Sequence, residues 1–342
     1  MFVVDTCLDE DELVHLRDAL QQTLNLLPED ALVGLVTFGT LVQVHELGFS
    51  DCPKAYVFRG EKEYSSQKVQ DMLGISPSNR GGPGSVPGGM GGGGGRQPAL
   101  GKFLLPVGEC TFALEQVLED LQRDPWPCQP DERVQRCTGT AVSVAISLLE
   151  AAMPVPKQGS RVMLFIAGPP TVGAGAIVGR SKKESIRSHL DLQKGQVPMY
   201  KPSMDFFKCL SDRCINNSIV VDVFACSLDQ VGTLEIRGLV ARSGGLVVLA
   251  DKFGQSVFRE SLRRAFERSP ADSNPSIDPA AEIGGAESSN NGNNSSNQLQ
   301  MGFGGHIEVI HSREFKIAGA IGPVASMKKA GPGVAETEVG VG

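Results

Sequence analysis

The segment GPPTVGAG, residues 168–175, follows a stretch of apolar residues and has the glycine content of loops that bind phosphate groups. Gly168 and Gly173 have the spacing of the two glycines in the phosphate loop G-x-x-x-x-G-K-S/T. The next two residues are Ala174 and Gly175, where that motif needs a lysine for the phosphates and a hydroxyl for magnesium. The dinucleotide motif G-x-G-x-x-G fails too, because its third glycine is missing and two prolines lack amide donors. A nucleotide-binding enzyme that uses this loop is therefore only an alternative interpretation.

A second candidate site begins at Asp5-Thr6-Cys7-Leu8-Asp9, directly after the first apolar segment. In an open α/β sheet, ligands gather at the carboxyl ends of the strands, so this is a place where a metal could bind. The pattern resembles the D-x-S-x-S loop of von Willebrand factor A domains, whose carboxylate and two hydroxyls hold magnesium. Asp5 matches the carboxylate of that motif, whereas Cys7 and Asp9 replace its two serines. A soft thiol is a poor ligand for the hard magnesium ion.

The other ligands of that family are also incomplete in this chain. The resemblance implies a threonine before a central helix, which Thr138 or Thr140 could supply, and an aspartate after the fourth core strand, where Gly168 stands. We therefore predict a degenerate site without a metal ion, in which Asp5 and Asp9 cap a turn and a helix. A metal-dependent von Willebrand A adhesion module remains an alternative that a magnesium titration would test.

The composition narrows the class of protein. With 342 residues, the chain is long enough for one large domain and part of a second. Its net charge of -7 argues against general nucleic-acid binding. The eight cysteines include no C-x-x-C pair, which predicts reduced thiols and no zinc site. No apolar run is long enough to cross a membrane and no signal peptide begins at Met1, so we expect a soluble, cytoplasmic chain. Because the phosphate-binding and metal-binding motifs are incomplete, we expect no cofactor.

The elements that position these residues alternate along the chain. Five short apolar runs are typical of strands buried on both faces of a parallel sheet; they are MFVV at 1–4, ALVGLVTF at 31–38, RVMLFIA at 161–167, SIVVDVFA at 218–225 and GLVVLA at 245–250. Three helices are predicted between these strands. In the first, leucines recur every three or four residues from Leu13 to Leu27, and in the second, residues 138–152 are apolar on nearly all sides. The third is LEIRGLVARS, which we expect to end at Gly244. This alternation predicts an α/β fold with a doubly wound, mainly parallel sheet.

Two low-complexity segments interrupt the pattern. Residues 74–99 are rich in glycine and proline and residues 269–300 in serine and asparagine, so neither has the apolar side chains to form a core. From His306 the sequence HIEVIHSREFKIAGAIGPV alternates, which predicts strands with one wet face. We therefore predict an α/β domain at 1–268, a disordered loop at 269–300, and a last strand with part of an antiparallel β-sandwich at 301–342.

Longer segments of the sequence carry a resemblance to a known family. They are FVVDTC, LLPEDALVGLVTFGTLVQVHEL, YVFRG, LQRDPWP, RVMLFIAGPPT, DVFACSLDQVG and REFKIAGAIGP. In this order they resemble the GTPase-activating subunit of the inner COPII vesicle coat, over almost the whole chain apart from the two low-complexity segments. That family has a von Willebrand A-like trunk domain with inserted loops, followed by a β-sandwich, a helical domain and a gelsolin-like domain. The resemblance therefore implies a von Willebrand A-like α/β fold.

The resemblance also implies a function and partners. The family forms a curved heterodimer with the cargo-binding COPII subunit on endoplasmic reticulum membranes, engages the coat's small GTPase and recruits the outer-cage subunit. The implied location is cytoplasmic and peripheral, at endoplasmic reticulum exit sites and on vesicles bound for the Golgi. An anionic membrane surface is a further implied contact, and nucleic acid is not a partner.

Two features of that family have no counterpart in this sequence. The family's four-cysteine zinc finger precedes the trunk, so zinc is a cofactor of the full-length family and not of these residues. The family's catalytic arginine, which stabilises charge on the transferring phosphoryl group, follows the β-sandwich and so lies beyond Gly342. We therefore give no catalytic role to Arg59, Arg123 or Arg313 and expect no enzymatic activity from this chain alone.

A few side chains are candidates for contacts with partners. Trp126 in DPWP and Phe303 in GFGG are aromatic residues that could anchor a protein interface. A basic cluster that could face anionic lipid consists of Arg259, Arg263 and Arg264. A core position for the aromatic residues and a solvated helix face for the arginines are the alternatives.

Overall fold

A computed structural model of the chain describes residues 1–49, 52–76, 99–152, 159–267 and most of 302–326. Within the last range, residues 313, 316, 318, 319 and 321 are not described. The predicted loop at 269–300 and nearly all of the predicted loop at 74–99 therefore lie outside the described residues.

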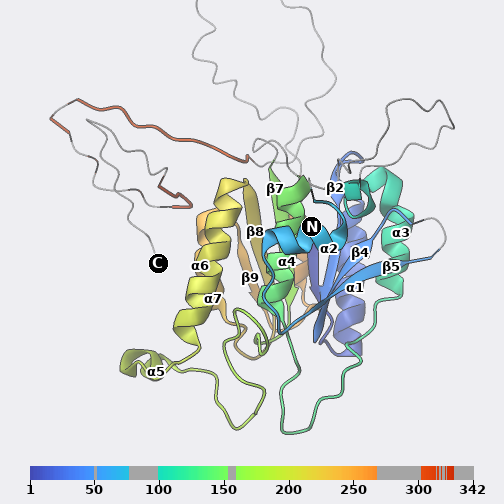
Figure 1. Ribbon diagram of the computed structural model, residues 1–342, viewed down its shortest axis with the longest axis horizontal. Coiled ribbons are helices and arrows are strands. Elements are labelled where there is room, and N and C mark those ends of the chain that lie inside the picture. Colours follow the sequence, from blue (N-terminus) through green and yellow to red (C-terminus); the bar gives the residue numbers. More distant parts are fainter. Residues whose placement is uncertain are drawn as a thin grey trace, which may run out of the picture.

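The described residues form a seven-stranded sheet between two layers of helices (Figure 1). Its strand order is β5-β4-β3-β1-β7-β8-β9; β4 pairs antiparallel with β3 and β5, and the other neighbouring strands of this sheet pair in parallel. The strands are β1 (Phe2–Asp5), β3 (Leu35–Phe38), β4 (Leu41–Glu46), β5 (Lys54–Arg59), β7 (Ser160–Ile166), β8 (Ile219–Cys226) and β9 (Val247–Ala250). This sheet confirms the predicted α/β fold class with a mainly parallel sheet.

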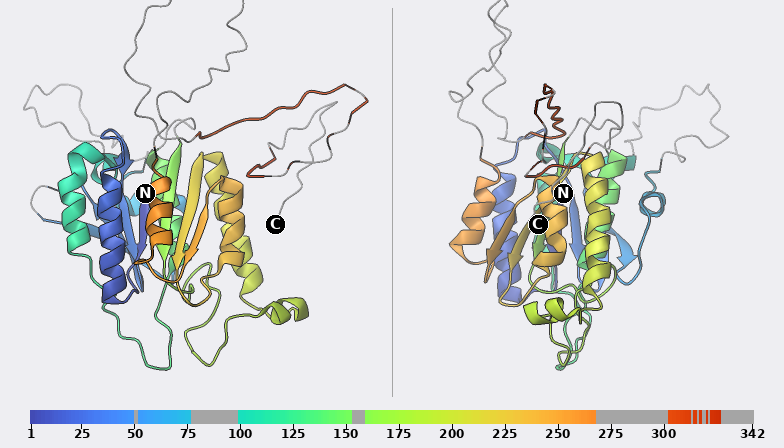
Figure 2. Two further views of the ribbon diagram at one scale, coloured as in Figure 1. Left: turned by 180° about the vertical axis from the view of Figure 1, so that it is seen from behind. Right: turned by 90° about the vertical axis from the view of Figure 1, so that its left-hand side faces the viewer.

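Helices cover both faces of the sheet (Figures 1 and 2). One face is covered by α1 (Glu10–Leu24), α3 (Val107–Glu119) and α8 (Ser256–Arg264), and the other by α2 (Ser66–Leu73), α4 (Thr138–Ala152), α6 (Tyr200–Asn216) and α7 (Thr233–Ser243). The short helix α5 (His189–Lys194) lies at the lower edge in Figure 1. Because strands such as β8 are buried on both faces, they carry apolar residues without strict alternation.

The helix at 138–152 has the predicted limits and the predicted environment. Every residue of α4 from Thr138 to Leu149 is buried, because the helix lies between the sheet and the outer helices α2 and α6. The helix α7 ends at Gly244 with φ of 79°, a left-handed conformation that glycine adopts without steric cost. Both predictions are confirmed.

The segment at 31–38 is not one strand as predicted. It divides at Gly34 into β2 (Leu32–Val33), which pairs antiparallel with β6 (Leu105–Pro106), and β3, which joins the main sheet. A Cβ at Gly34 would lie 2.7 Å from the carbonyl oxygen of Phe103, so the two segments approach too closely there for a larger residue. The neighbouring hairpin of β4 and β5 was not predicted, since only half of the β4 side chains are fully buried.

The start of α1 differs from the predicted cap. Asp9 occupies the N-cap position, but its side chain makes no capping hydrogen bond. Glu12 instead accepts a hydrogen bond from the amide of Phe253 at 2.7 Å, which ties α1 to the segment before α8. The helix ends at Leu24, one turn before Leu27. The predicted Asp9 cap is therefore wrong, because the Asp9 carboxylate lies 3.7 Å from Nη1 of Arg123 and accepts no hydrogen bond from an amide of the first helical turn.

The strands predicted from His306 onward are not formed in the described residues. Those between 302 and 326 contain no helix and no strand, and Ile307, Val309 and Phe315 are exposed. Alternation alone does not make a strand, because the backbone groups need a neighbouring strand as hydrogen-bond partner. The assignment of 301–342 to a last strand and part of a β-sandwich stays a prediction. No helix in the described ranges has the length and hydropathy to cross a membrane.

Candidate functional site

The candidate site lies at the carboxyl ends of the parallel strands, at the lower edge of the sheet in Figure 1. The turn after β1, the loop between α3 and α4, and the loop after β7 meet there. The amide of Asp124 donates to the carbonyl of Thr6 at 2.9 Å, and the amide of Thr171 donates to the carbonyl of Arg136 at 3.0 Å. Three segments distant in sequence are thereby joined at this edge.

Asp5 is the last residue of β1 and is completely buried. Its Oδ1 accepts a hydrogen bond from the Cys7 amide at 2.8 Å, which is the turn cap that the sequence predicts. Its Oδ2 accepts from the Ala167 amide at 3.0 Å and from Nε of Arg136 at 2.6 Å. Both carboxylate oxygens are therefore satisfied by the protein itself.

Arg136 places a fixed positive charge beside Asp5. The side chain is buried, and its guanidinium also donates to the carbonyl of Cys7 at 3.1 Å and to that of Pro169 at 3.5 Å. Burial lowers the pKa of Arg136, but the adjacent Asp5 carboxylate outweighs it, so the net pKa lies above the ordinary value. The two side chains form a buried ion pair that is also hydrogen-bonded, as a stable buried ion pair requires.

These residues do not fit a magnesium site. Magnesium requires an octahedral set of oxygen ligands, whereas the Asp5 oxygen is already bound by a guanidinium that would repel a second cation. A Cβ at Gly168 would lie 2.5 Å from Nη1 of Arg136, so an aspartate there would displace the arginine. Burial, followed by the Asp5 charge, raises the pKa of Cys7, and this neutral thiol contacts the carbonyl of Gln135 at 3.4 Å.

The other residues of the predicted degenerate site make no hydrogen bond with Asp5. Asp9 has a largely exposed side chain and lies 3.7 Å from Nη1 of Arg123. Thr140 donates to the carbonyl of Gly60 at 2.9 Å. Thr138 is buried, and within the described part of the chain its hydroxyl has no hydrogen-bond partner. The described residues contain no cluster of three or more histidine, cysteine or carboxylate side chains suited to a metal ion.

The glycines of the 168–175 loop have a packing role. Gly173 and Gly175 have φ of 77° and 78°, which disfavours any residue with a Cβ. A Cβ at Gly173 would lie 2.2 Å from the Gly60 carbonyl oxygen, and one at Gly175 would lie 2.9 Å from the Phe207 ring. The loop therefore packs closely against other segments of the domain, which supports the interpretation that it does not bind a nucleotide.

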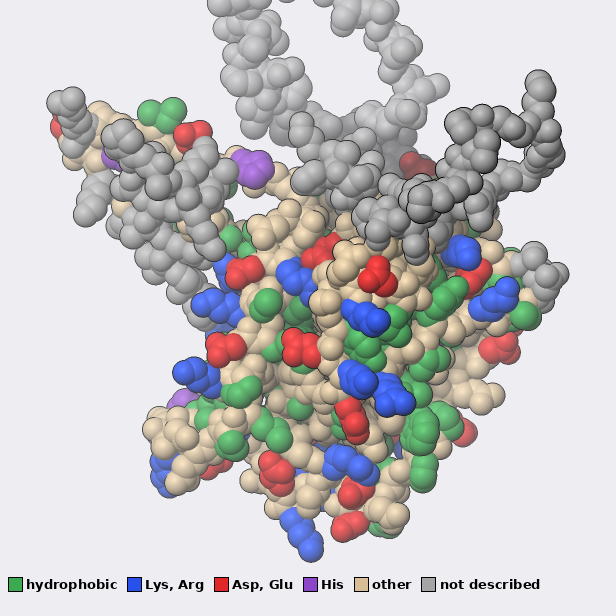
Figure 3. Space-filling view, in the orientation of Figure 1, with side chains coloured by type: hydrophobic (Ala, Val, Ile, Leu, Met, Phe, Trp, Pro, Cys, Tyr) green, Lys and Arg blue, Asp and Glu red, His purple; other side chains and the backbone are tan. Residues whose placement is uncertain are grey.

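The candidate contact residues lie on separate surfaces. Phe303 lies over Gly159 at the start of β7, since a Cβ at Gly159 would be 1.8 Å from Cγ of Phe303. Trp126 lies at the opposite end of the sheet, beyond the end of β1. The three arginines at 259, 263 and 264 are exposed on α8. On the face in Figure 3, acidic and basic side chains are interspersed. The roles of these residues in binding stay predictions.

Sequence reasoning missed two central residues, Arg136 and Asp124. Arg136 pairs with Asp5, and Asp124 accepts hydrogen bonds from the amides of Trp126 and Thr40. The sequence offers one signal for Arg136. Gly168 stands where the metal-binding family has an aspartate, and a glycine there leaves room for another side chain beside Asp5. For Asp124 the sequence offers only the turn-forming string DPWP.

His45 of β4 is held in its neutral form. Its Nε2 lies 2.9 Å from Oγ1 of Thr37, and burial lowers the pKa of the ring from 6.5 to about 4. Between these two values the unfolded chain binds a proton that the folded chain does not bind.

We expect His45 to make the protein less stable in acid. Because the folded protein holds this ring neutral, the contribution of His45 to the free energy of unfolding is fully present above pH 6.5 and is lost as the pH falls from 6.5 to about 4. The total loss is at most about 3 kcal/mol. Urea unfolding of wild type and His45→Gln at neutral and acidic pH measures it. Wild type should lose more stability than the variant, and equal losses would contradict the prediction.

Comparisons with known proteins agree with this architecture. A family model described as the Sec23/Sec24 trunk domain matches residues 1–268. Among solved structures, the human COPII-coat protein Sec24c is similar with a TM-score of 0.50 and 16% identity, over 78% of this chain and 32% of that chain. The chain thus spans about a third of the length of that structure, whose likeness shows the fold alone.

Two further solved structures are similar at lower scores. A von Willebrand factor type A protein from Catenulispora acidiphila has a TM-score of 0.40 and 12% identity, over 79% of this chain and 43% of that chain. The SpRpn10 VWA domain has a TM-score of 0.33 and 10% identity, over 77% of this chain and 92% of that chain. The seven-stranded, mainly parallel sheet with helices on both faces is of the predicted von Willebrand A-like type.

Proposed function

The chain belongs to the Sec23/Sec24 trunk domain family, and we propose that it is a scaffold of the inner COPII coat in vesicle transport from the endoplasmic reticulum to the Golgi. The observation that carries this proposal is the family match, which spans the whole folded α/β domain. We infer further that the chain corresponds to the trunk of the GTPase-activating subunit, because the seven sequence segments resemble that subunit in order.

The proposed partners follow from that assignment. The trunk pairs with the cargo-binding COPII subunit, and the assembled coat engages the small GTPase, the outer-cage subunit and the anionic endoplasmic reticulum surface. The exposed arginines of α8 are suited to the last contact, because several cations on one surface act together on anionic lipid. The proposed location is the cytoplasmic face of exit sites and COPII vesicles, and the zinc of the full-length family is not proposed for these residues.

The alternatives from other classes have less support. A metal-dependent adhesion module needs open oxygen ligands at Asp5, where Arg136 is already bound. A nucleotide-binding enzyme needs free amides and a lysine in the 168–175 loop, which instead packs against Gly60 and Phe207. Scaffolding requires only a folded surface.

We expect purified residues 1–342 to form a heterodimer with the cargo-binding COPII subunit. A folded trunk offers a surface that can bury the area of a stable protein interface. Analytical ultracentrifugation of the mixture measures the complex, and the Asp5→Asn/Arg136→Met double variant tests whether the buried pair matters for pairing. The matched control is an unrelated von Willebrand A domain at equal concentration. Absence of a complex with a chain that is folded by circular dichroism would refute the proposed pairing.

A further inference from the structure

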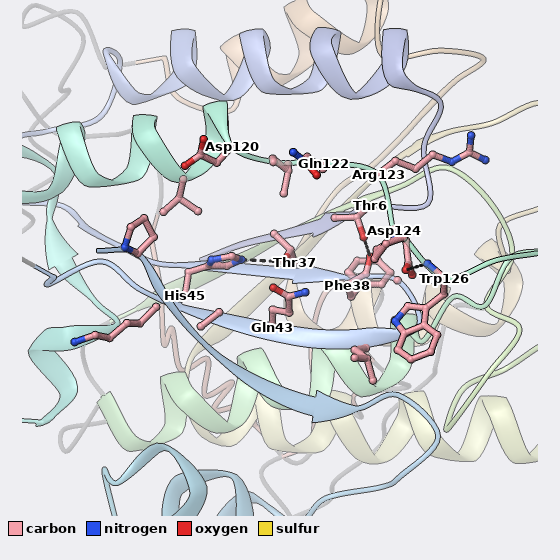
Figure 4. Close-up of a pocket in the computed structure, with 18 residues that line it drawn as sticks. Thr6, Thr37, Phe38, Gln43, His45, Asp120, Gln122, Arg123, Asp124 and Trp126 are labelled. Carbon is pink, nitrogen blue, oxygen red and sulfur yellow. Dashed lines mark hydrogen bonds between the residues drawn. The ribbon is translucent and has the colours of Figure 1, made fainter. Parts of the chain in front are cut away.

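A concave pocket lies on the sheet face that carries α1 and α3, between β3, β4 and β5 and the segment that follows α3 (Figure 4). It has a volume of about 440 Å³, within the usual range for ligand pockets. Its floor is formed by side chains of the β3-β4-β5 strands, and one wall is the segment from Asp120 to Trp126. Asp5, Cys7 and Arg136 of the degenerate metal site do not line this pocket.

The floor offers neutral hydrogen-bonding groups. Thr37 of β3 and His45 of β4 are joined at 2.9 Å, and the exposed amide of Gln43 lies two residues before His45 on the same face of β4 (Figure 4). His45 is half-buried beside Thr37, which lowers the pKa of its ring to about 4, so the ring is uncharged at neutral pH. Residues two apart on a strand repeat at about 6.8 Å, which is also the repeat of an extended peptide laid beside it.

The wall of the pocket holds the chain's single tryptophan at a fixed position. Trp126 is 54% exposed, and its backbone amide donates to Oδ1 of Asp124 at 3.1 Å. The other oxygen of Asp124 accepts from the amide of Thr40. A Cβ at Gly39 would lie 2.0 Å from that oxygen, so the close approach needs glycine. An exposed aromatic ring on a turn that hydrogen bonds fix in place is a pre-formed contact site for an apolar group of a ligand.

The charges around the pocket balance. Lys54 and Arg123 are matched by Asp120 and Asp124, and Arg123 also lies 3.7 Å from the Asp9 carboxylate. Phosphate groups or strongly acidic ligands need an excess of cations, which these residues do not supply. The lining therefore favours a ligand without net charge, with one apolar side chain and regularly spaced amides.

We propose that this pocket binds a short extended peptide segment of another protein. One large apolar side chain of the peptide lies against Trp126, and its backbone amides bond to Gln43 and His45. The floor selects an extended backbone by its spacing, and the tryptophan selects the apolar side chain. This proposal does not depend on the coat function, because it concerns only the lining of the pocket.

The test is selection of a random heptapeptide library, displayed on phage, against purified residues 1–342. We expect enrichment of uncharged peptides with one large apolar residue. An enriched peptide, made synthetically, should then change the fluorescence of Trp126 in a saturable manner. Because no net charge is involved, its Kd should change less than about twofold between about 0.05 and 0.5 M salt.

Variants locate the binding. Ala55→Arg places a large side chain at the exposed edge of the pocket and should abolish binding, while Gln43→Ala should weaken it by about threefold to tenfold. Trp126→Ala should weaken peptide binding about 30-fold or more. Because this variant lacks the fluorescent tryptophan, its Kd is measured by calorimetry. The control is Phe112→Ala, which removes an exposed aromatic residue of α3 outside the pocket and should leave the Kd unchanged. No enrichment, enrichment of charged salt-sensitive peptides, or binding that survives Ala55→Arg would each overturn the proposal.

Discussion

Replacing Arg136 with methionine is expected to lower the free energy of unfolding by about 3–5 kcal/mol and the melting temperature by about 10 °C. The methionine keeps most of the side-chain volume, so the loss measures the charge and its hydrogen bonds. The Asp5 carboxylate would remain buried with two amide donors and no positive charge beside it. The carbonyls of Cys7 and Pro169 would also lose their donor. Urea and thermal unfolding provide the measurement.

Two controls separate this effect from a general loss of ion pairs. Arg242→Met removes a pair with Asp212 whose side chains are 27% and 49% exposed, and it should cost less than about 1 kcal/mol. Asp5→Asn/Arg136→Met should be more stable than Arg136→Met by about 1–2 kcal/mol, because the double variant no longer buries an unpaired charge. A loss below about 1 kcal/mol for Arg136→Met would contradict the interpretation. The interpretation would also be contradicted if calorimetry showed tight, stoichiometric magnesium binding by the wild type and none by Asp5→Ala.

The position of Asp5 could be predicted from sequence, whereas its partner could not. A buried strand that ends in a carboxylate has a local pattern, and the parallel sheet places that end at a ligand-binding edge. Arg136 is separated from Asp5 by 131 residues, and nothing in QRCTG distinguishes it from an exposed arginine. Only the folded topology brings the loop before α4 to the end of β1. Long-range ion pairs of this kind are invisible to patterns that span a few residues.

The same contrast holds for the secondary structure. Strands and helices with strong apolar patterns, such as β8 and α4, were predicted within a residue or two. The β4-β5 hairpin was missed, because its outer face carries Gln43 and His45 and forms the pocket floor. A half-covered strand resembles a loop in composition, so the strands that form the pocket floor are hard to predict from sequence.

The most extreme rate effect that we expect concerns GTP hydrolysis by the coat's small GTPase. An arginine supplied in trans accounts for about 10³ to 10⁵ in rate, and the resemblance places the family's catalytic arginine in the region after the β-sandwich. Several arginines of the described chain are engaged in its own ion pairs, namely Arg136, Arg161, Arg180, Arg187, Arg213 and Arg242. Such arginines are poorly suited to reach into a partner's active site, because leaving their carboxylates unpaired would cost free energy.

We therefore expect residues 1–342 to bind the partner subunit. Their acceleration of GTP hydrolysis should be less than about one hundredth of that given by a full-length relative. Single-turnover hydrolysis with equal concentrations of the two proteins measures this. A full-length relative whose catalytic arginine is replaced by alanine is the matched control, and it should fall to the level of residues 1–342. Equal acceleration by this chain and the intact relative would refute the prediction. The exposed Arg59 and Arg123 would then be the first residues to replace, because Arg59 lies on the surface and the pair of Arg123 with Asp9 is open to solvent and costs little to break.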